Sequence, residues 1–408
     1  MRNILCNILN PVSADRIEFL PRHVISIEQG IIQSIIPAEA QELTDVEDFS
    51  DCLALPGFID LHVHLSQYRM RGLYEPALLP WLNKYVFPEE ARSAETGYAT
   101  DLAKQFYQAL CQAGTTTSII YTAPSEAACE AAFAVAEEIG IRAMIGMTMM
   151  DQNSPAGLVQ STTKSLDTSF ALYERWHGKN PLLDYIFTPR FAPTCSMELM
   201  KEVSRFAYDH NSWIQTHLSE NTDELAWVKD LFGLNSYTEV YEKAGLLTPH
   251  SIFGHAIHLT NIELSMLKAN EAKLAHCPDS NFYLKSGEYP MQRILEAGIE
   301  FGLGSDVGAG TTLNMLHHAK MMNFRQSSLS VMPANALYHI TLGSARLLGM
   351  ESRIGSINAG KDADIVLLKP PVGYPISEQS LSQLVFFGNE FEVKHTMVAG
   401  RVVHNQTD

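Results

Sequence analysis

Short runs of apolar residues alternate with segments of helical periodicity from Phe58 to about Leu348. Eight runs have the length and composition of buried strands, and most precede a segment that we predict to be helical, such as residues 196–209. The predicted strands are FIDLHVHL (58–65), TTTSIIYT (115–122), IRAMIGMT (141–148), LDYIFTPR (183–190), SWIQTHLS (212–219), SIFGHA (251–256), AKLAHC (272–277) and IEFGLGSD (299–306). Such alternation is typical of a parallel sheet, and eight units favour a closed barrel over an open doubly wound sheet.

The two ends of the chain carry a different pattern. VISI (24–27) and IIQSII (31–36) are β-branched runs on either side of a tight turn, and residues 362–368 and 395–404 alternate in a similar way. Neither end has enough strand for a stable sheet, so we expect the ends to pair. The predicted fold is α/β. Residues 1–55 and 353–408 form a small composite β-sandwich domain, and residues 56–352 form a distorted (β/α)8 TIM barrel.

The composition is that of a globular protein, and its charge disfavours some classes of partner. Of 408 residues, 46% are hydrophobic and 18% are charged, with a net charge of −17. This charge disfavours nucleic acid and anionic membranes, and no segment has the pattern of a spanning helix. We therefore expect a small-molecule ligand. The six cysteines show no disulfide spacing and the first residues lack a signal-peptide pattern, so we expect a cytoplasmic protein.

Reactive side chains fall at the ends of the predicted strands, where barrels of this kind place their active sites. His62 and His64 end the first strand, and residues two apart point to one face of a strand. His217, His255 and Asp306 end the fifth, sixth and eighth strands. Alone, each has a simple structural explanation, a buried imidazole or a helix cap. Together they predict a zinc site, because zinc prefers imidazole and carboxylate ligands.

The motifs around these residues, PGFIDLHVH, THLSEN, GHAIHL, HCPDSN and GLGSDVGAGT, resemble those of the amidohydrolase superfamily of metal-dependent barrels. Gln67 and the segments LLPWLNKYVFPEE (78–90) and TPRFAPTCS (188–196) narrow the resemblance to its guanine deaminase branch. The resemblance implies hydrolytic deamination of guanine to xanthine and ammonia by a homodimer. The alternative is deamination of another amino-heterocycle, such as 8-oxoguanine or a pterin.

The resemblance also implies one zinc ion per chain. Its ligands would be His62, His64, His217 and Asp306. Binuclear members of the superfamily usually add a modified Lys or another bridging acid at the fourth strand, and here that strand ends in Pro189-Arg190. A mononuclear site therefore follows from the resemblance. Two other interpretations stay open: a scaffold that has lost catalysis, and a ring-opening amidohydrolase that needs two metals.

The remaining site residues take their roles from the same resemblance. Glu220 would move protons between water and the purine ring, and His255 and Asp306 would assist catalysis. Gln67, Arg190, Phe191 and His217 would bind the substrate, and Asn281 would orient its neighbours. Three of them have structural alternatives: Arg190 as half of an ion pair, Phe191 as a packing residue, and Glu220 as an exposed carboxylate on the next helix.

Overall fold

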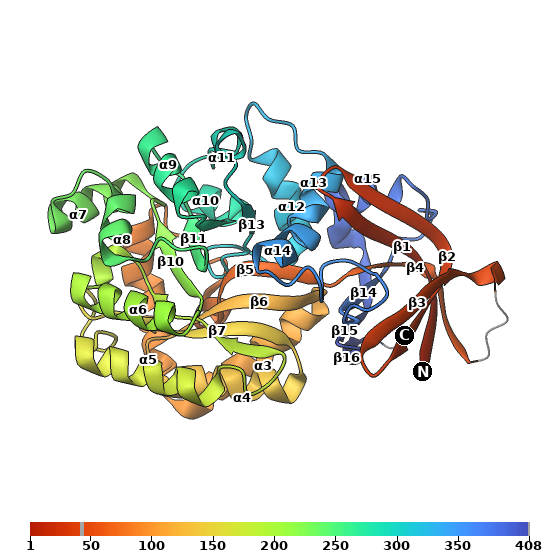
Figure 1. The fold of residues 1–408 in the computed structure, drawn as a ribbon, viewed down its shortest axis with the longest axis horizontal. Coiled ribbons are helices and arrows are strands. Elements are labelled where there is room, and N and C mark those ends of the chain that lie inside the picture. Colours follow the sequence, from red (N-terminus) through yellow and green to blue (C-terminus); the bar gives the residue numbers. More distant parts are fainter. Residues whose placement is uncertain (41–44, 407–408) are drawn as a thin grey trace.

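The computed structural model describes residues 1–40 and 45–406, which form a barrel with a seven-stranded sheet at one side (Figure 1). The barrel strands are β5 (Phe58–His64), β6 (Thr115–Thr122), β7 (Arg142–Met149), β8 (Leu183–Tyr185) with β9 (Thr188–Pro189), β10 (Ile214–Leu218), β11 (Ser251–His255), β12 (Lys273–His276) and β13 (Phe301–Leu303). All pairings among them are parallel. The (β/α)8 barrel expected from the sequence is confirmed, and the split of its fourth strand into β8 and β9 is one of its distortions.

Backbone contacts on two sides join the barrel's halves. Between β8 and β10, Phe187 forms a parallel bridge with Ile214. Between β13 and β5, Asp306 N donates to His62 O (2.8 Å) and His64 N donates to Val307 O (2.8 Å). The second closure thus lies at the residues that the sequence predicts to hold a metal.

Helices follow most of the barrel strands and cover the outside of the barrel (Figure 1). They are α3 (Thr96–Gln112), α4 (Glu126–Ile139), α5 (Thr162–Trp176), α6 (Met197–Asp209), α7 (Thr222–Phe232), α8 (Tyr237–Ala244), α9 (Asn261–Ala269), α10 (Pro278–Tyr283), α11 (Met291–Ala297), α12 (Met315–Phe324), α13 (Pro333–Tyr338) and α14 (Leu342–Leu347). The predicted helix at residues 196–209 is α6, whose N-cap Ser196 accepts a hydrogen bond from Leu199 N. Among the described residues, no helix has the length and apolar character needed to cross a membrane.

The connection between β5 and α3, residues 65–95, contains several short helical pieces and is called the β5–α3 segment below. These pieces are η2 (Leu65–Met70), α1 (Leu78–Trp81), the π-helical turn η3 (Leu82–Val86) and α2 (Phe87–Arg92). Their apolar side chains pack in a separate core cluster that includes Trp81 and Phe191. The segment therefore reaches across to the end of β9.

Both ends of the chain contribute strands to one sheet, as expected from the sequence. Its order is β16-β15-β14-β4-β1-β2-β3. The strands are β1 (Arg2–Ser13), β2 (Arg16–Glu28), β3 (Ile31–Pro37), β4 (Val46–Pro56), β14 (Ile365–Lys369), β15 (Glu392–Val398) and β16 (Arg401–Asn405), with α15 (Ser380–Phe387) before β15. Antiparallel pairing of β4 with β14 joins the two ends. The residue boundaries of the domains stay a prediction.

A buried ion-pair cluster ties the barrel to this sheet. Arg142 begins β7 and is 3% exposed. Its guanidinium donates to Asp364 Oδ2 (Nε, 3.1 Å) and to Asp362 Oδ2 (Nη2, 2.8 Å). Asp364 Oδ1 also accepts from Ala399 N (2.7 Å) in the turn after β15. Because a buried charge without its partner is strongly destabilising, this cluster depends on all its members.

Substituting Arg142 with Met should lower the free energy of unfolding by about 3–5 kcal/mol, because Asp364 would remain buried without its cation. The matched control is Arg175→Met, which removes an exposed ion pair with Glu130 and should change the free energy by about 0–1 kcal/mol. Urea unfolding followed by circular dichroism measures both. Equal, small effects of the two substitutions would contradict a linking role for the cluster.

Candidate active site

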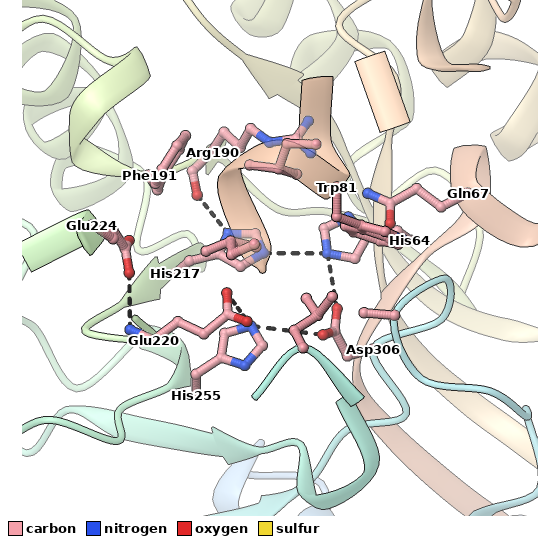
Figure 2. Close-up of a pocket in the computed structure, with 14 residues that line it drawn as sticks. His64, Gln67, Trp81, Arg190, Phe191, His217, Glu220, Glu224, His255 and Asp306 are labelled. Carbon is pink, nitrogen blue, oxygen red and sulfur yellow. Dashed lines mark hydrogen bonds and ion pairs between the residues drawn. The ribbon is translucent and has the colours of Figure 1, made fainter. Parts of the chain in front are cut away.

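A pocket opens at the carboxyl ends of the barrel strands (Figure 2). It is lined by His64, Gln67, Leu78, Trp81, Leu82, Arg190, Phe191, His217, Glu220, Glu224, His255, Leu284, Asp306 and Ala309. Most of the polar lining residues lie at or just after the ends of β5, β9, β10, β11 and β13. The apolar lining residues Leu78, Trp81 and Leu82 belong to the β5–α3 segment. The structure therefore brings the predicted site residues to one place.

Histidine rings from three strands surround Asp306. One ligand atom each of His62, His217, His255 and Asp306 lies within 4.8 Å of the others, and all four residues are buried. His64 belongs to the same cluster, because its Nε2 lies 3.2 Å from His217 Nε2 and 3.3 Å from Asp306 Oδ1. This geometric group of four differs from the predicted zinc ligands in one member, His255 in place of His64. The predicted ligand set stays a prediction.

The protonation of these groups suits a metal cation. Burial lowers the pKa of His62 and His217, and lowers that of His64 to about 3, so that the imidazoles are neutral at pH 7. Burial alone would raise the pKa of Asp306, but contacts with His62 and His64 outweigh it and hold that pKa well below its usual range. The site therefore contains nitrogen lone pairs beside an ionised carboxylate.

Local contacts orient individual rings toward the centre of the cluster. His217 Nδ1 donates to Arg190 O (2.6 Å), which leaves a lone pair on Nε2. His62 Nε2 is buried, makes no hydrogen bond among the described residues, and lies 3.4 Å from Asp306 Oδ1. A lone-pair nitrogen and a buried nitrogen without a hydrogen bond, next to a carboxylate, fit a zinc ion.

The backbone around the cluster adopts uncommon conformations. His255 and Asp306 have φ angles of 67° and 48°, in the left-handed region that non-glycine residues rarely occupy. Gly254 allows a close approach: a Cβ there would lie 2.7 Å from His62 Cε1. Strain of this kind persists only where the surrounding structure enforces it, and it is concentrated at functional sites.

Glu220 faces this cluster from the loop after β10. It is 4% exposed, so the alternative of an exposed carboxylate on the next helix is wrong. Its Oε2 lies 3.5 Å from His255 Nε2, and its Oε1 accepts from Ser286 Oγ (3.1 Å). Burial and the neighbouring Asp306 raise the pKa of Glu220 to about 8. A carboxyl group that exchanges a proton near neutral pH is suited to acid–base catalysis.

Glu224, which the sequence analysis missed, also lines the pocket. Its Oε2 accepts from the backbone N of Glu220 (2.9 Å) and its Oε1 accepts from Tyr237 Oη (2.8 Å). Burial raises the pKa of Glu224 to about 7. In the sequence, Asn221-x-x-Glu224 has the pattern of a capping box, and the structure confirms the box at the start of α7. The residue thus fixes the loop that carries Glu220.

Besides His217, three residues predicted to bind substrate, Gln67, Arg190 and Phe191, line the pocket (Figure 2). A fourth residue, Glu90 of α2, connects two of them. Arg190 Nη1 donates to Glu90 Oε2 (2.6 Å), and Gln67 Nε2 donates to Glu90 Oε1 (3.1 Å). Arg190 is therefore both an ion-pair partner, the structural alternative raised above, and a pocket residue. Glu90 was missed because its position depends on the fold of the β5–α3 segment.

Three further residues in or near the pocket have clear positions. Trp81 lines the pocket and also packs in the core, since it is 3% exposed, and its Nε1 donates to Leu73 O (2.9 Å). Asn281 Oδ1 lies 2.9 Å from His255 Nδ1, so Asn281 contacts a site residue in the way expected of it. Cys277 is buried, and burial raises its pKa well above the ordinary thiol value, which disfavours a nucleophilic role.

Comparison with known proteins agrees with this geometry. The sequence profile of the amidohydrolase family matches residues 53–403. Guanine deaminase from Escherichia coli (strain K12) is 34% identical over 414 residues, which cover 96% of this chain and 93% of that protein. The structure of E. coli guanine deaminase aligns over 100% of both chains with a TM-score of 0.95 and 32% identity.

A second solved structure, guanine deaminase from C. acetobutylicum with guanine bound in the active site, has a TM-score of 0.91 and 29% identity. It covers 99% of this chain and 100% of that one. The family profile spans most of the chain, and a relative above 30% identity matches it almost from end to end. The chain therefore belongs to the amidohydrolase family, and these full-length relatives are guanine deaminases.

Proposed function

We propose that this protein hydrolyses guanine to xanthine and ammonia, with one zinc ion per chain. The observation that carries the proposal is one buried pocket that combines a His–Asp cluster, a carboxyl group of raised pKa and the Gln67–Arg190–Phe191 set. Similarity over the whole chain to guanine deaminases supports the choice of substrate, and one of those relatives has guanine in its active site.

His62, His64, His217 and Asp306 would hold the zinc ion, which supplies a nucleophile at neutral pH by lowering the pKa of water towards about 7. The neutral imidazoles and the ionised Asp306 are the protonation states that such an ion requires. Asp306 has a second task, because its other oxygen, Oδ2, lies 3.8 Å from His255 Nε2 and can accept a proton on its way to departing ammonia.

Glu220 moves protons between water and the purine. It takes one proton from the attacking water and delivers it to ring N3, while the water oxygen bonds to C2. The second proton of that water reaches the C2 amino group by way of Asp306, so that this group leaves as ammonia and C2 keeps the oxygen as a carbonyl. Its raised pKa places both protonation states within reach at neutral pH. His255 lies between Glu220 and Asp306, held through Nδ1 by Asn281, and stabilises the charge that develops on the attacking oxygen.

The rest of the pocket orients the ring. Arg190 has N–H donors beyond the one bonded to Glu90, and these suit a purine carbonyl. Phe191 and Trp81 offer flat apolar surface for stacking. Gln67 offers both a donor and an acceptor to the ring edge. From the family resemblance we also propose that the protein is cytoplasmic and that it forms a homodimer. Light scattering of the purified protein would test the homodimer.

The direct test is release of ammonia from guanine by zinc-loaded protein, with xanthine followed by its ultraviolet spectrum. We expect one xanthine and one ammonia per guanine consumed, and turnover of guanine well above that of 8-oxoguanine or a pterin, because the Arg190–Gln67 pair matches the guanine edge. Preference for either of the other compounds would transfer the proposal to that amino-heterocycle. No deamination of any of them by protein that contains zinc would refute it.

Substituting Glu220 with Gln should leave zinc and guanine binding intact and reduce kcat roughly 10²–10⁴-fold, because the amide cannot exchange a proton. Metal analysis, equilibrium binding of guanine and steady-state kinetics measure the three properties. Glu242→Gln, an exposed carboxylate in α8, is the control and should retain wild-type kcat. Turnover of Glu220→Gln close to the wild type would exclude the proton-transfer role.

Zinc content of two variants tests the ligand set. His64→Ala should bind far less than one zinc per chain, whereas His255→Ala should retain zinc and lose turnover, because His255 acts on the reacting oxygen. His210→Ala, an exposed histidine after α6, should behave as the wild type. Atomic absorption after identical dialysis gives the metal content. The reverse result would assign the ion to the geometric group that contains His255.

A further inference from the structure

We propose that Glu90 is a positioning residue that sets what the pocket presents to the purine ring. This inference rests on the guanine deaminase function proposed above. Glu90 belongs to α2 in the β5–α3 segment, is 1% exposed, and is absent from the residues that line the pocket. It lies behind Gln67 and Arg190 and contacts both. It therefore acts on the substrate through these two side chains.

Glu90 and Gly308 together determine which way the Gln67 carboxamide points. Gln67 Nε2 donates to Glu90 Oε1 (3.1 Å), and Gly308 N donates to Gln67 Oε1 (3.3 Å). A carboxylate only accepts and a backbone N–H only donates. Half a turn of the amide would therefore place two acceptors together at Glu90 and two donors together at Gly308. One N–H of Gln67 Nε2 and one lone pair of Oε1 are used in these two hydrogen bonds. The remaining N–H and the remaining lone pair are therefore held in fixed directions, in which they can meet a ligand.

The same carboxylate holds the guanidinium of Arg190. Arg190 Nη1 donates to Glu90 Oε2 at 2.6 Å, and both side chains are almost fully buried. The Phe87 ring of the same helix lies 5.4 Å from the Arg190 guanidinium carbon. Among the described residues, one of the five guanidinium N–H groups is used in the ion pair, and the other four are available to a ligand. α2 thus fixes the orientation of the Arg190 guanidinium, and the carboxylate of Glu90 balances the positive charge of that guanidinium.

The net charge of the Arg190–Glu90 pair decides which ligand the Arg190 guanidinium prefers. Beside Glu90, Arg190 belongs to a buried ion pair whose net charge is zero, which suits the uncharged carbonyl of guanine. Without the carboxylate, Arg190 would be a buried cation with no partner from α2, and such a cation attracts an anion. Xanthine has a second carbonyl in place of the amino group of guanine and is the stronger acid. Glu90 therefore favours binding of the substrate over retention of the ionised product.

The test compares Glu90→Gln with Glu89→Gln. Glu89 is the neighbouring carboxylate of α2. It pairs with Arg92 and accepts a hydrogen bond from Tyr98 Oη, and among the described residues no hydrogen bond joins it to Gln67 or Arg190. In Glu90→Gln we expect the KM for guanine to rise at least tenfold with kcat changed less than threefold, because the lost interaction orients the bound ring. The inhibition constant of xanthine, divided by the KM of guanine, should fall at least tenfold. Glu89→Gln should match the wild type in all three.

Controls separate positioning from general loss of structure. Zinc per chain and the melting temperature are measured for every variant. If Glu90→Gln does not fold, Glu90→Asp decides the question, because it keeps the charge and shortens the reach: it should raise the KM at least threefold with little change in kcat. A wild-type KM in the folded variant, or loss of kcat at unchanged KM and unchanged xanthine ratio, overturns the proposal.

Failure of the inference and failure of the proposed function give different results. If wild-type protein with zinc does not deaminate guanine, the proposed function fails before Glu90 is tested. If the wild type deaminates guanine and Glu90→Gln equals Glu89→Gln in KM and in the xanthine ratio, only the role of Glu90 is wrong.

Discussion

The hydrogen bonds that close the barrel between its first and last strands are made by the backbones of the site residues themselves. Asp306 N donates to His62 O, and His64 N donates to Val307 O. Asp60 reinforces this junction, because its Oδ1 accepts from the backbone N of both His62 (3.2 Å) and Ser305 (2.9 Å). The backbones that carry His62, His64 and Asp306 are therefore joined directly. Closure of the barrel at this junction brings three of the predicted zinc ligands together.

Burial at this junction has opposite effects on acids and bases, and the site depends on both. Loss of solvent lowers the pKa of His217, so its nitrogen stays free of a proton, and raises the pKa of Glu220 to about 8. Asp306 resists this effect, because histidine rings contact its carboxylate. One pocket thus contains lone-pair nitrogens, an ionised carboxylate and a carboxyl group able to exchange a proton. Hydrolytic deamination needs these three states together.

The predictable part of this molecule is the part that follows from periodicity. Buried strands are recognisable from apolar runs, and parallel strands end on one face, so His62, His217 and Asp306 could be placed together from sequence. Glu90 and Trp81 could not, since they lie in the β5–α3 segment, whose short helical pieces include a π-helical turn and have no common period. Their positions follow from tertiary contacts, such as that between Glu90 and Arg190, which are 100 residues apart.

The strand ends and the β5–α3 segment also differ in the roles that we propose for them. The strand ends carry the groups that we propose to move protons and to hold the metal, and barrel closure joins the backbones of His62, His64 and Asp306. The β5–α3 segment carries Gln67, Trp81 and Glu90, and it reaches the strand ends through the pairing of Glu90 with Arg190. A change in this segment can alter which ring edge fits without moving the His–Asp cluster. Under the proposed function, the choice between guanine and another amino-heterocycle lies in the Gln67–Glu90–Arg190 contacts, because the chemistry proposed for the metal site is common to all such substrates.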